Sequence, residues 1–154
     1  MKKILLLAFT ITLAVGVTAQ DLTPVQQKNS SFTGAQATKK LYHVIYQMDN
    51  GDPKIIEKVL RNLTNALDDP RLKGKLKAEL IAFSGGTDAY VKGSKYEDQL
   101  KSLVDRGVIV VQCANTLKER KIERNQIYPF IGVVPSGNGE LILRQAEGWA
   151  VIKP

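Results

Sequence analysis

The sequence predicts an α/β fold, a three-layer α/β/α sandwich with a five-stranded parallel sheet in its middle. Two observations predict it. From Leu41 onward, short apolar runs alternate with stretches in which apolar residues recur at helical spacing. In addition, the run at 108–111 is apolar on both sides, as interior strands of parallel sheets are. Residues 41–154 show no shift in composition, so we expect them to form one domain.

The first half of this domain contains a strand, a turn and a long helix. Residues 41–46 form the first predicted strand, and residues 49–51 (Asp-Asn-Gly) turn the chain. Asp52 can cap a helix, and Pro53 suits its first position. Asp68-Asp69-Pro70 should end this helix, whose apolar residues are Ile56, Val59, Leu60, Leu63 and Leu67.

The second half repeats the alternation. Residues 78–83 and 108–111 form the second and third strands, joined by a helix that carries Tyr96 and Leu100 and ends at Arg106-Gly107. The remaining elements are expected at 116–120 (helix), 131–134 (strand), 139–147 (helix) and 149–152 (strand). Right-handed crossovers between successive strands then make the sheet parallel.

Residues 1–19 have the features of a secretory signal peptide. Lys2 and Lys3 precede an apolar run of about 14 residues, and Val17-Thr18-Ala19 supplies small residues for cleavage before Gln20. The run is shorter than the roughly 20 residues of a membrane span, so no stable span should remain after cleavage. Residues 20–40 are polar and lack a hydrophobic period, and we expect them to form a flexible leader. The mature protein is expected to be exported, to the periplasm or alternatively to the extracellular space.

Composition excludes several functional classes. The single Cys and the single His cannot build a disulfide, a cysteine zinc site or a double-histidine centre, so we expect no metal and no cofactor. The net charge of +7 includes a basic cluster at Arg71, Lys73, Lys75 and Lys77. This cluster has no interleaved aromatic residues and is interpreted as a solvated loop, so no nucleic-acid partner is expected.

Cys113 is the residue on which a chemical function would rest. It follows the third strand and precedes a short helix, and ligands of parallel sheets bind beyond the carboxyl ends of the strands. Thr116 and Glu119 fit a capping box, which would direct the helix N-terminus toward the thiol and favour the thiolate. Lys118 and Arg120 would add to that field if they pointed inward. The alternative is that Cys113 is a small buried hydrophobic residue.

Other strand-end residues are candidates for binding a small anion through backbone N–H groups. They are Ser84, Gly85, Gly86, Asn115, Thr116, Ser136 and Gly137, the last two in the run Ser136-Gly137-Asn138-Gly139. The alternative is that these Gly-rich junctions are only tight turns between strands and helices. His43 could act as a base only if the fold brought it to the thiol, and its place in the first strand favours a hydrogen-bonded sheet residue instead.

In sequence order, several stretches carry a family resemblance. These are the first strand running into 48–53, then 79–86, 107–117, and 133–137 through 145–154. Together they resemble the DsrE/DsrF-like family over nearly the whole of residues 41–154. The resemblance implies a five-stranded parallel sheet and assembly into homo-oligomers, trimers or hexamers. In the sulfur-relay branch of that family, a Cys at the end of the third strand carries a persulfide between partner proteins, and Cys113 matches that Cys by position.

Three functional hypotheses follow. In the first, the protein is an exported sulfur carrier in which Cys113 accepts a sulfur atom from a donor and passes it to an acceptor protein. In the second, it is a non-catalytic oligomeric module that binds a small anion or a partner, with Cys113 structural. In the third, Cys113 is a redox sensor that pairs with another thiol. The consecutive apolar residues Leu141, Ile142 and Leu143 favour an oligomer, since one side of the last helix suffices to cover the sheet.

Overall fold

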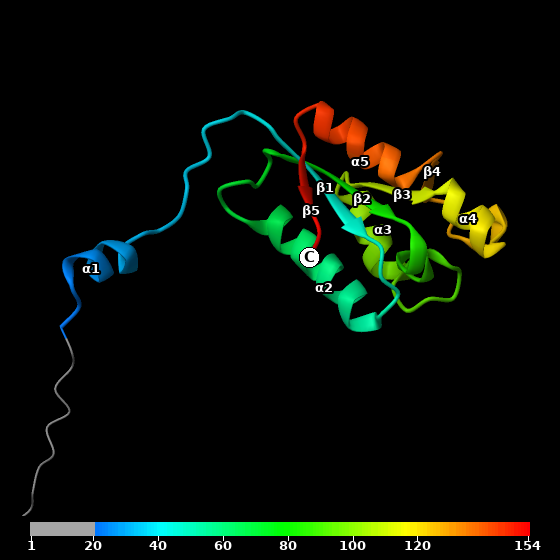
Figure 1. Cartoon of the computed structure of the whole chain (residues 1–154), viewed down its shortest axis with the longest axis horizontal. Coiled ribbons are helices and arrows are strands. Elements are labelled where there is room, and N and C mark those ends of the chain that lie inside the picture. The colour runs from blue at the N-terminus through cyan, green and yellow to red at the C-terminus, as the bar shows by residue number, and fades with distance from the viewer. Residues whose placement is uncertain (1–20) are drawn as a thin grey trace, which may run out of the picture. The chain divides into compact units, whose positions relative to one another are not determined.

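A computed structural model describes residues 21–154 (Figure 1). The predicted signal peptide, residues 1–19, and its cleavage site lie outside the described residues. The described chain divides into an N-terminal segment that ends at Ala35 and a compact unit, Gln36–Pro154. We describe each by itself.

The N-terminal segment contains a short helix that the sequence analysis did not predict. Helix α1, Pro24–Ser30, begins with a capping box in which Thr23 and Gln26 bond each other's backbone N–H groups. None of its seven residues is buried. Because α1 rests on local caps and not on an apolar face, the absence of a hydrophobic period in residues 20–40 gave no sign of it.

The compact unit is built on the predicted five-stranded parallel sheet. Within the described residues its strand order is β4-β3-β2-β1-β5. The run at 108–111 belongs to an interior strand, as predicted, although β2 holds the middle place. The strands are β1 (Tyr42–Met48), β2 (Leu76–Ala82), β3 (Ile109–Cys113), β4 (Gly132–Val134) and β5 (Ala150–Ile152).

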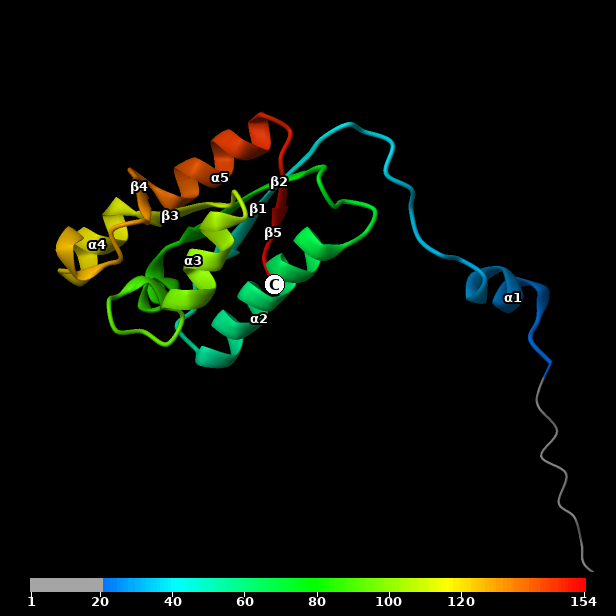
Figure 2. The same cartoon turned by 180° about the vertical axis from the view of Figure 1, so that it is seen from behind.

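The helices follow from the order of the strands. The chain steps from β1 to β4 in one direction across the sheet, so right-handed crossovers place their connections on one face. The step from β4 to β5 returns across the sheet and therefore places its helix on the other face. The first group contains α2 (Pro53–Asp68), α3 (Glu97–Asp105) and α4 (Ala114–Arg120), and the returning helix is α5 (Gly137–Ala146). Figures 1 and 2 show α2 and α3 on one side of the strands and α5 on the other.

Two short 3₁₀ helices complete the unit. The first, Ser84–Tyr90, follows β2, and the second, Arg124–Gln126, precedes β4.

Asp52 caps α2 by accepting a hydrogen bond from the Lys54 N–H at 2.8 Å, with Pro53 in the first position, as the sequence predicted. Gly107 ends α3 with a positive φ of 85°, which its lack of a side chain permits.

The two faces of the sheet bury unequal cores. The α2–α3 face holds the larger one, which includes Leu63, Leu80 and Leu100 and extends to Leu117 of α4. On the α5 face the core is smaller, and it centres on Ile45, Ile81, Val111 and Trp149. Both helical layers of the predicted three-layer sandwich are present, and α5 forms the layer on the second face of the sheet. In the part of the chain described, no helix combines the length and apolarity needed to cross a membrane.

Candidate functional site

The order of the strands creates a crevice between the ends of β3 and β4. The chain leaves β3 toward α4 on one face and leaves the adjacent β4 toward α5 on the opposite face. Where two neighbouring strands send their connections to opposite faces, the loops separate and leave a place for a ligand. Cys113 is the last residue of β3, and Ser136 and Gly137 follow β4.

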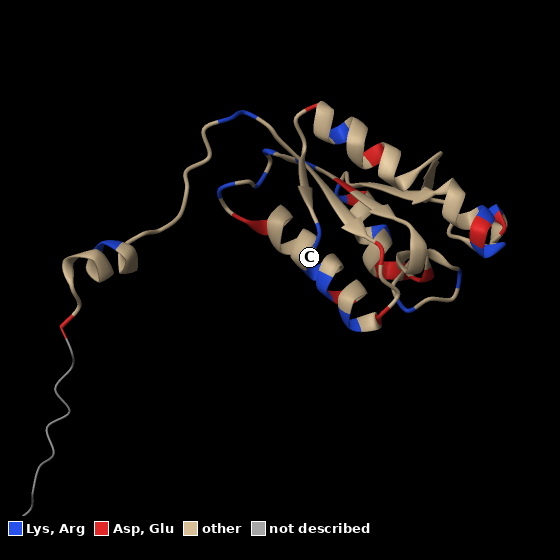
Figure 3. Ribbon diagram, viewed as in Figure 1, with Lys and Arg blue, Asp and Glu red and all other residues tan. Residues whose placement is uncertain are grey.

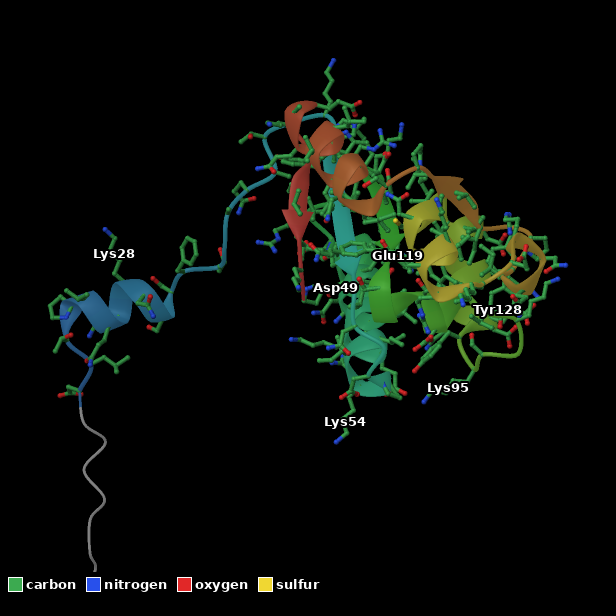
Figure 4. The ribbon with its side chains drawn as sticks, turned by 45° about the vertical axis from the view of Figure 1, so that its right-hand side comes forward. Lys28, Asp49, Lys54, Lys95, Glu119 and Tyr128 are labelled. Atoms are coloured by element: carbon green, nitrogen blue, oxygen red, sulfur yellow. The ribbon has the colours of Figure 1, made fainter. Side chains whose placement is uncertain are left out.

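A cavity of about 150 Å³ occupies this crevice. A cavity needs only about 10–15 Å³ to hold one water molecule, so this one has room for a small group beside the thiol. Glu119, labelled in Figure 4, lies on its wall and comes from α4. The complete lining is Phe83, Ser84, Cys113, Asn115, Thr116, Glu119, Ser136, Gly137 and Asn138.

The Cys113 side chain points to the α5 side of the sheet. It shares the strand parity of Ile109 and Val111, which pack in the core of that face, and it is 5% exposed. Burial raises the pKa of the thiol, but polar groups near the sulfur outweigh it and hold the pKa below its ordinary value. These groups are the backbone N–H groups of Thr116, Gly137 and Asn115 and the Thr116 hydroxyl. The first turns of α4 and α5 thus lie beside the same thiol.

The predicted capping box at Thr116 is wrong. Helix α4 begins at Ala114 with Cys113 in the capping position, and no side chain caps it. Strand β3 extends to Cys113 because it pairs with Val134 of β4, so the helix starts directly after the strand. Thr116 is therefore inside the helix, where its hydroxyl accepts a hydrogen bond from the Ser84 N–H at 3.0 Å.

Ser84 is held in an uncommon conformation beside the cavity. Its φ is 48°, in the left-handed region that a residue with a side chain rarely adopts. Thr116 fixes its N–H, and Arg120 donates to its carbonyl oxygen at 2.9 Å. The Arg120 guanidinium also pairs with Asp88 at 2.6 Å. Arg120 therefore holds Ser84, a residue of the cavity wall, in place but does not itself line the cavity.

The second predicted cation, Lys118, is exposed and does not line the cavity either. Figure 3 shows acidic and basic residues interspersed at the end of α4, without a basic cluster. Among the described residues that line the cavity, Glu119 has the one charged side chain, and no Lys, Arg or His is present. The hypothesis that Lys118 and Arg120 add a positive field at the thiol therefore does not hold.

The structure brings together most of the predicted site residues, but not Gly85 and Gly86. These two glycines allow the chain to pass close to the loop after β1. A Cβ on Gly86 would lie 2.0 Å from the Met48 carbonyl oxygen, and one on Gly85 would lie 2.6 Å from the Gly51 nitrogen. They belong to a tight turn, which is the alternative that the sequence analysis gave to an anion-binding site at this junction.

Two lining residues were missed by the sequence analysis, Phe83 and Glu119. Glu119 had a usable signal, because it is three residues after Thr116 on the same helix face. Phe83 had none, since it was assigned to the end of a buried strand. In the structure it is half-buried and packs against the core of the α5 face.

His43 lies far from the thiol. It is near the start of β1, opposite Lys77 of β2, whereas Cys113 ends β3 at the other edge of the sheet. Its ring lies 5.0 Å from that of Trp149. His43 is therefore a sheet residue, as the sequence favoured, and not a base for Cys113.

A buried ion pair attaches α5 to the sheet. Glu79 on β2 is fully buried, and one of its carboxylate oxygens accepts a hydrogen bond from Arg144 Nε at 2.7 Å. Burial raises the pKa of Glu79, and the charge of Arg144 opposes that rise. The Arg144 guanidinium also stacks over Trp149 at 4.4 Å. This anchor fixes the helix whose first turn carries Gly137.

A larger depression of about 670 Å³ in the described region lies between α2 and α3. It is lined by polar residues such as Thr64 and Asp98, but by no Cys or His that could act as a nucleophile or a base. The described residues also contain no group of three or more His, Cys, Asp or Glu side chains placed to hold a metal ion.

Comparison with known proteins places this geometry in a family. The model of the DsrE/DsrF-like family matches residues 71–154, which is more than half of the chain. The chain belongs to the DsrE/DsrF-like family. All nine residues that line the cavity fall within the matched region.

Solved structures agree with a DsrE-like fold. A protein of unknown function from Methanobacterium thermoautotrophicum, MTH1491, is 29% identical, with a TM-score of 0.69 over 73% of this chain and 99% of that one. The ychN protein of E. coli is 16% identical, with a TM-score of 0.61 over 74% of this chain and 99% of that one, a likeness of fold. A search of curated proteins finds no match.

Proposed function

We propose that this DsrE-like protein is a sulfur carrier in which the Cys113 thiolate accepts a sulfur atom from a persulfide. The observation that supports this most is the place of Cys113 on the wall of a cavity between the first turns of α4 and α5. Nearby N–H groups and the Thr116 hydroxyl hold the pKa of the thiol below its ordinary value, which favours the thiolate, the nucleophilic form. The cavity beside the sulfur leaves space for one more sulfur atom, whereas a purely structural Cys needs none.

The transfer step is a displacement at sulfur. The Cys113 thiolate attacks the terminal sulfur of a donor R–S–SH, and a new S–S bond forms while the bond between the two donor sulfurs breaks. The donor leaves as the thiolate R–S⁻ with the electron pair of the broken bond, and Cys113 becomes a persulfide that keeps the proton. No external oxidant or reductant is needed.

The surrounding residues suit such an intermediate. Cys113 is 5% exposed, so the inner sulfur of the persulfide is shielded from larger thiols and oxidants. The N–H group of Gly137 and the side chains of Ser136 and Asn138 border the space beside it. Shielding matters for the proposed export to the periplasm, since a bare persulfide is consumed in an oxidising compartment.

Mass spectrometry tests the proposal. The folded protein, with Cys113→Ser as control, is exposed to a low-molecular-weight hydropersulfide and separately to iodoacetamide. We expect the wild type to gain the mass of one sulfur and to be alkylated, and the Cys113→Ser variant to do neither. A Cys113 that stays unmodified by both reagents in the folded protein would falsify the proposal.

We further propose that the protein is a homo-oligomer, a trimer or hexamer. The support is an apolar surface on α5, where Ile142 is 67% and Leu143 is 61% exposed. Leu141, by contrast, packs against the sheet, so one side of α5 suffices to cover it. Two large aliphatic side chains at this exposure favour burial against another copy of the chain.

The alternative function, a binding module with a structural Cys113, keeps the same cavity. Its support is the polar lining, in which Ser84, Asn115, Ser136 and Asn138 offer hydrogen-bonding groups. Under this alternative, Cys113→Ser leaves stabilisation by a small anion unchanged in a thermal-shift assay. Under the sulfur-carrier proposal, the same variant loses all sulfur uptake.

A further inference from the structure

We infer that Glu119 makes the Cys113 cavity selective for sulfur donors that are uncharged at their reacting end, and that it disfavours anionic donors such as thiosulfate. This inference rests on the proposed sulfur-carrier function and names the donor class for the same site. It follows from the charges around the cavity, taken one at a time.

The first observation is the lining itself. Among the described residues that form the wall, Glu119 carries the one formal charge, and it is negative. Glu119 is exposed and three residues beyond Thr116, so it lies on the same face of α4 as the Thr116 hydroxyl. An incoming group therefore meets a carboxylate on the wall of the cavity.

The two basic residues of α4 do not offset this charge. The Arg120 guanidinium is bonded to the Ser84 carbonyl oxygen and to the Asp88 carboxylate, so its charge is already balanced. Lys118, in the same helix, is exposed and is not part of the wall. A site built for a sulfur oxyanion would place a guanidinium or ammonium group against its oxygens.

The remaining positive potential comes from the backbone N–H groups of Asn115, Thr116 and Gly137, three residues that line the cavity with Cys113. These groups lower the pKa of the thiol, so part of their potential acts on the thiolate. A thiosulfate dianion approaching for attack would meet both the thiolate and Glu119. The protonated form of a hydropersulfide, R–S–SH, carries no charge at its reacting end, so it meets neither repulsion, and it is the form attacked in the proposed transfer step.

The size of the cavity limits which part of the donor enters. About 150 Å³ holds the terminal sulfur and its neighbouring atoms, but the bulk of a peptide or protein donor stays outside. Charges on the rest of such a donor are then screened by solvent. The charge of the reacting end therefore determines the electrostatic repulsion that the donor meets in the cavity.

Two alkylating reagents of nearly equal shape measure this selectivity. Iodoacetamide is neutral and iodoacetate is an anion, and both react with the thiolate by displacing iodide. Their rate ratio cancels the fraction of thiolate, so a change in the pKa of Cys113 does not alter it. The protein unfolded in urea gives the reference ratio for the same thiol without the cavity.

We expect the folded wild type to favour iodoacetamide over iodoacetate by about two- to fivefold relative to the unfolded protein, the size of effect two nearby charges have in water. Glu119→Gln should abolish this preference, Glu119→Lys should reverse it, and high salt should weaken it. Asp98→Asn, which removes an exposed charge on the α2–α3 face, should leave it unchanged. Equal ratios in the wild type and Glu119→Gln would overturn the inference.

Sulfur uptake provides the second arm. Glu119→Gln should gain sulfur from thiosulfate about two- to fivefold faster than the wild type, with little change for the hydropersulfide of 2-mercaptoethanol. The wild type could take up sulfur while Glu119→Gln changes the uptake rate from both donors by the same factor. That result would overturn the selectivity and leave the proposed carrier function standing. If Cys113 reacts with no donor and no alkylating reagent, the proposed function itself fails and the inference falls with it.

Discussion

Replacing Thr116 with valine tests the thiolate site most directly. Thr116 is 4% exposed and has two roles, because its oxygen accepts a hydrogen bond from the Ser84 N–H at 3.0 Å and its hydroxyl lowers the pKa of Cys113. Valine keeps the shape and removes both interactions. We therefore expect the variant to fold, with a less acidic thiol.

The magnitude follows from the donors that remain. A hydrogen bond to a charged group contributes about 1.5–3 kcal/mol, and one pKa unit corresponds to about 1.4 kcal/mol. Since the backbone N–H groups that also lower this pKa remain in the variant, we take the lower end and expect the pKa of Cys113 to rise by about one unit. Below that pKa, alkylation should slow by about tenfold. The unpaired Ser84 N–H should cost about 0.5–1.5 kcal/mol of stability.

The assay is the rate of iodoacetamide alkylation as a function of pH, followed by mass spectrometry. Thr64→Val is a matched control, because the Thr64 hydroxyl bonds the Leu60 carbonyl oxygen on α2, on the face away from Cys113. It should leave the profile unchanged. If the profiles of Thr116→Val and the wild type coincide, the hydroxyl does not stabilise the thiolate and the electrostatic account of the site is wrong.

The same shift has a thermodynamic signature. A thiol whose pKa is lowered by folding adds stability as the pH rises from the folded value toward the unfolded value near 8.5. That contribution is complete above the unfolded pKa and is lost as the pH falls through the folded pKa. Thr116→Val should show a smaller gain over this window in urea unfolding.

Three further variants test the frame around the site. In Gly137→Ala, the new Cβ would lie 2.7 Å from Phe83 Cδ1, so urea unfolding should show a loss of about 1–3 kcal/mol and alkylation should show a raised pKa of Cys113. Arg144→Met leaves the Glu79 carboxylate buried and unpaired, which should cost about 2–4 kcal/mol at pH 7. Because burial raises the pKa of Glu79, protonation at lower pH should restore part of that stability in urea titrations at pH 5 and 7. If the protein forms the proposed oligomer, Ile142→Lys should convert it to smaller species in light scattering.

Each variant has a control in the same unit. Gly139→Ala places a Cβ 3.3 Å from that of Ser136, a milder contact in the same helix, and should cost less than Gly137→Ala. Arg106→Met breaks an exposed pair with Asp68 and should cost less than about 1 kcal/mol, independent of mild acid. Gln99→Lys adds a charge on α3 and should leave the assembly intact. A wild type that is monomeric at micromolar concentration contradicts the oligomer proposal.

Most of the fold could be predicted because it depends on patterns that are local in the chain. Apolar runs at 41–46 and 108–111 marked strands, and Asp52-Pro53 marked the start of α2, since each signal depends on a few neighbouring residues. Helix α4 was placed two residues late because its start depends on how far β3 pairs with β4. That pairing joins segments about twenty residues apart and leaves no local trace.

The sequence by itself determined that one thiol stands at the carboxyl end of an interior strand. It also determined the alternation that makes the sheet parallel. The tertiary structure decided what surrounds that thiol. Because β4 returns across the sheet to β5, the first turn of α5 faces that of α4, and Gly137 meets Thr116 at Cys113. The same geometry puts Glu119 on the cavity wall and keeps Arg120 off it, because a side chain's partner is set by which loops the fold brings together.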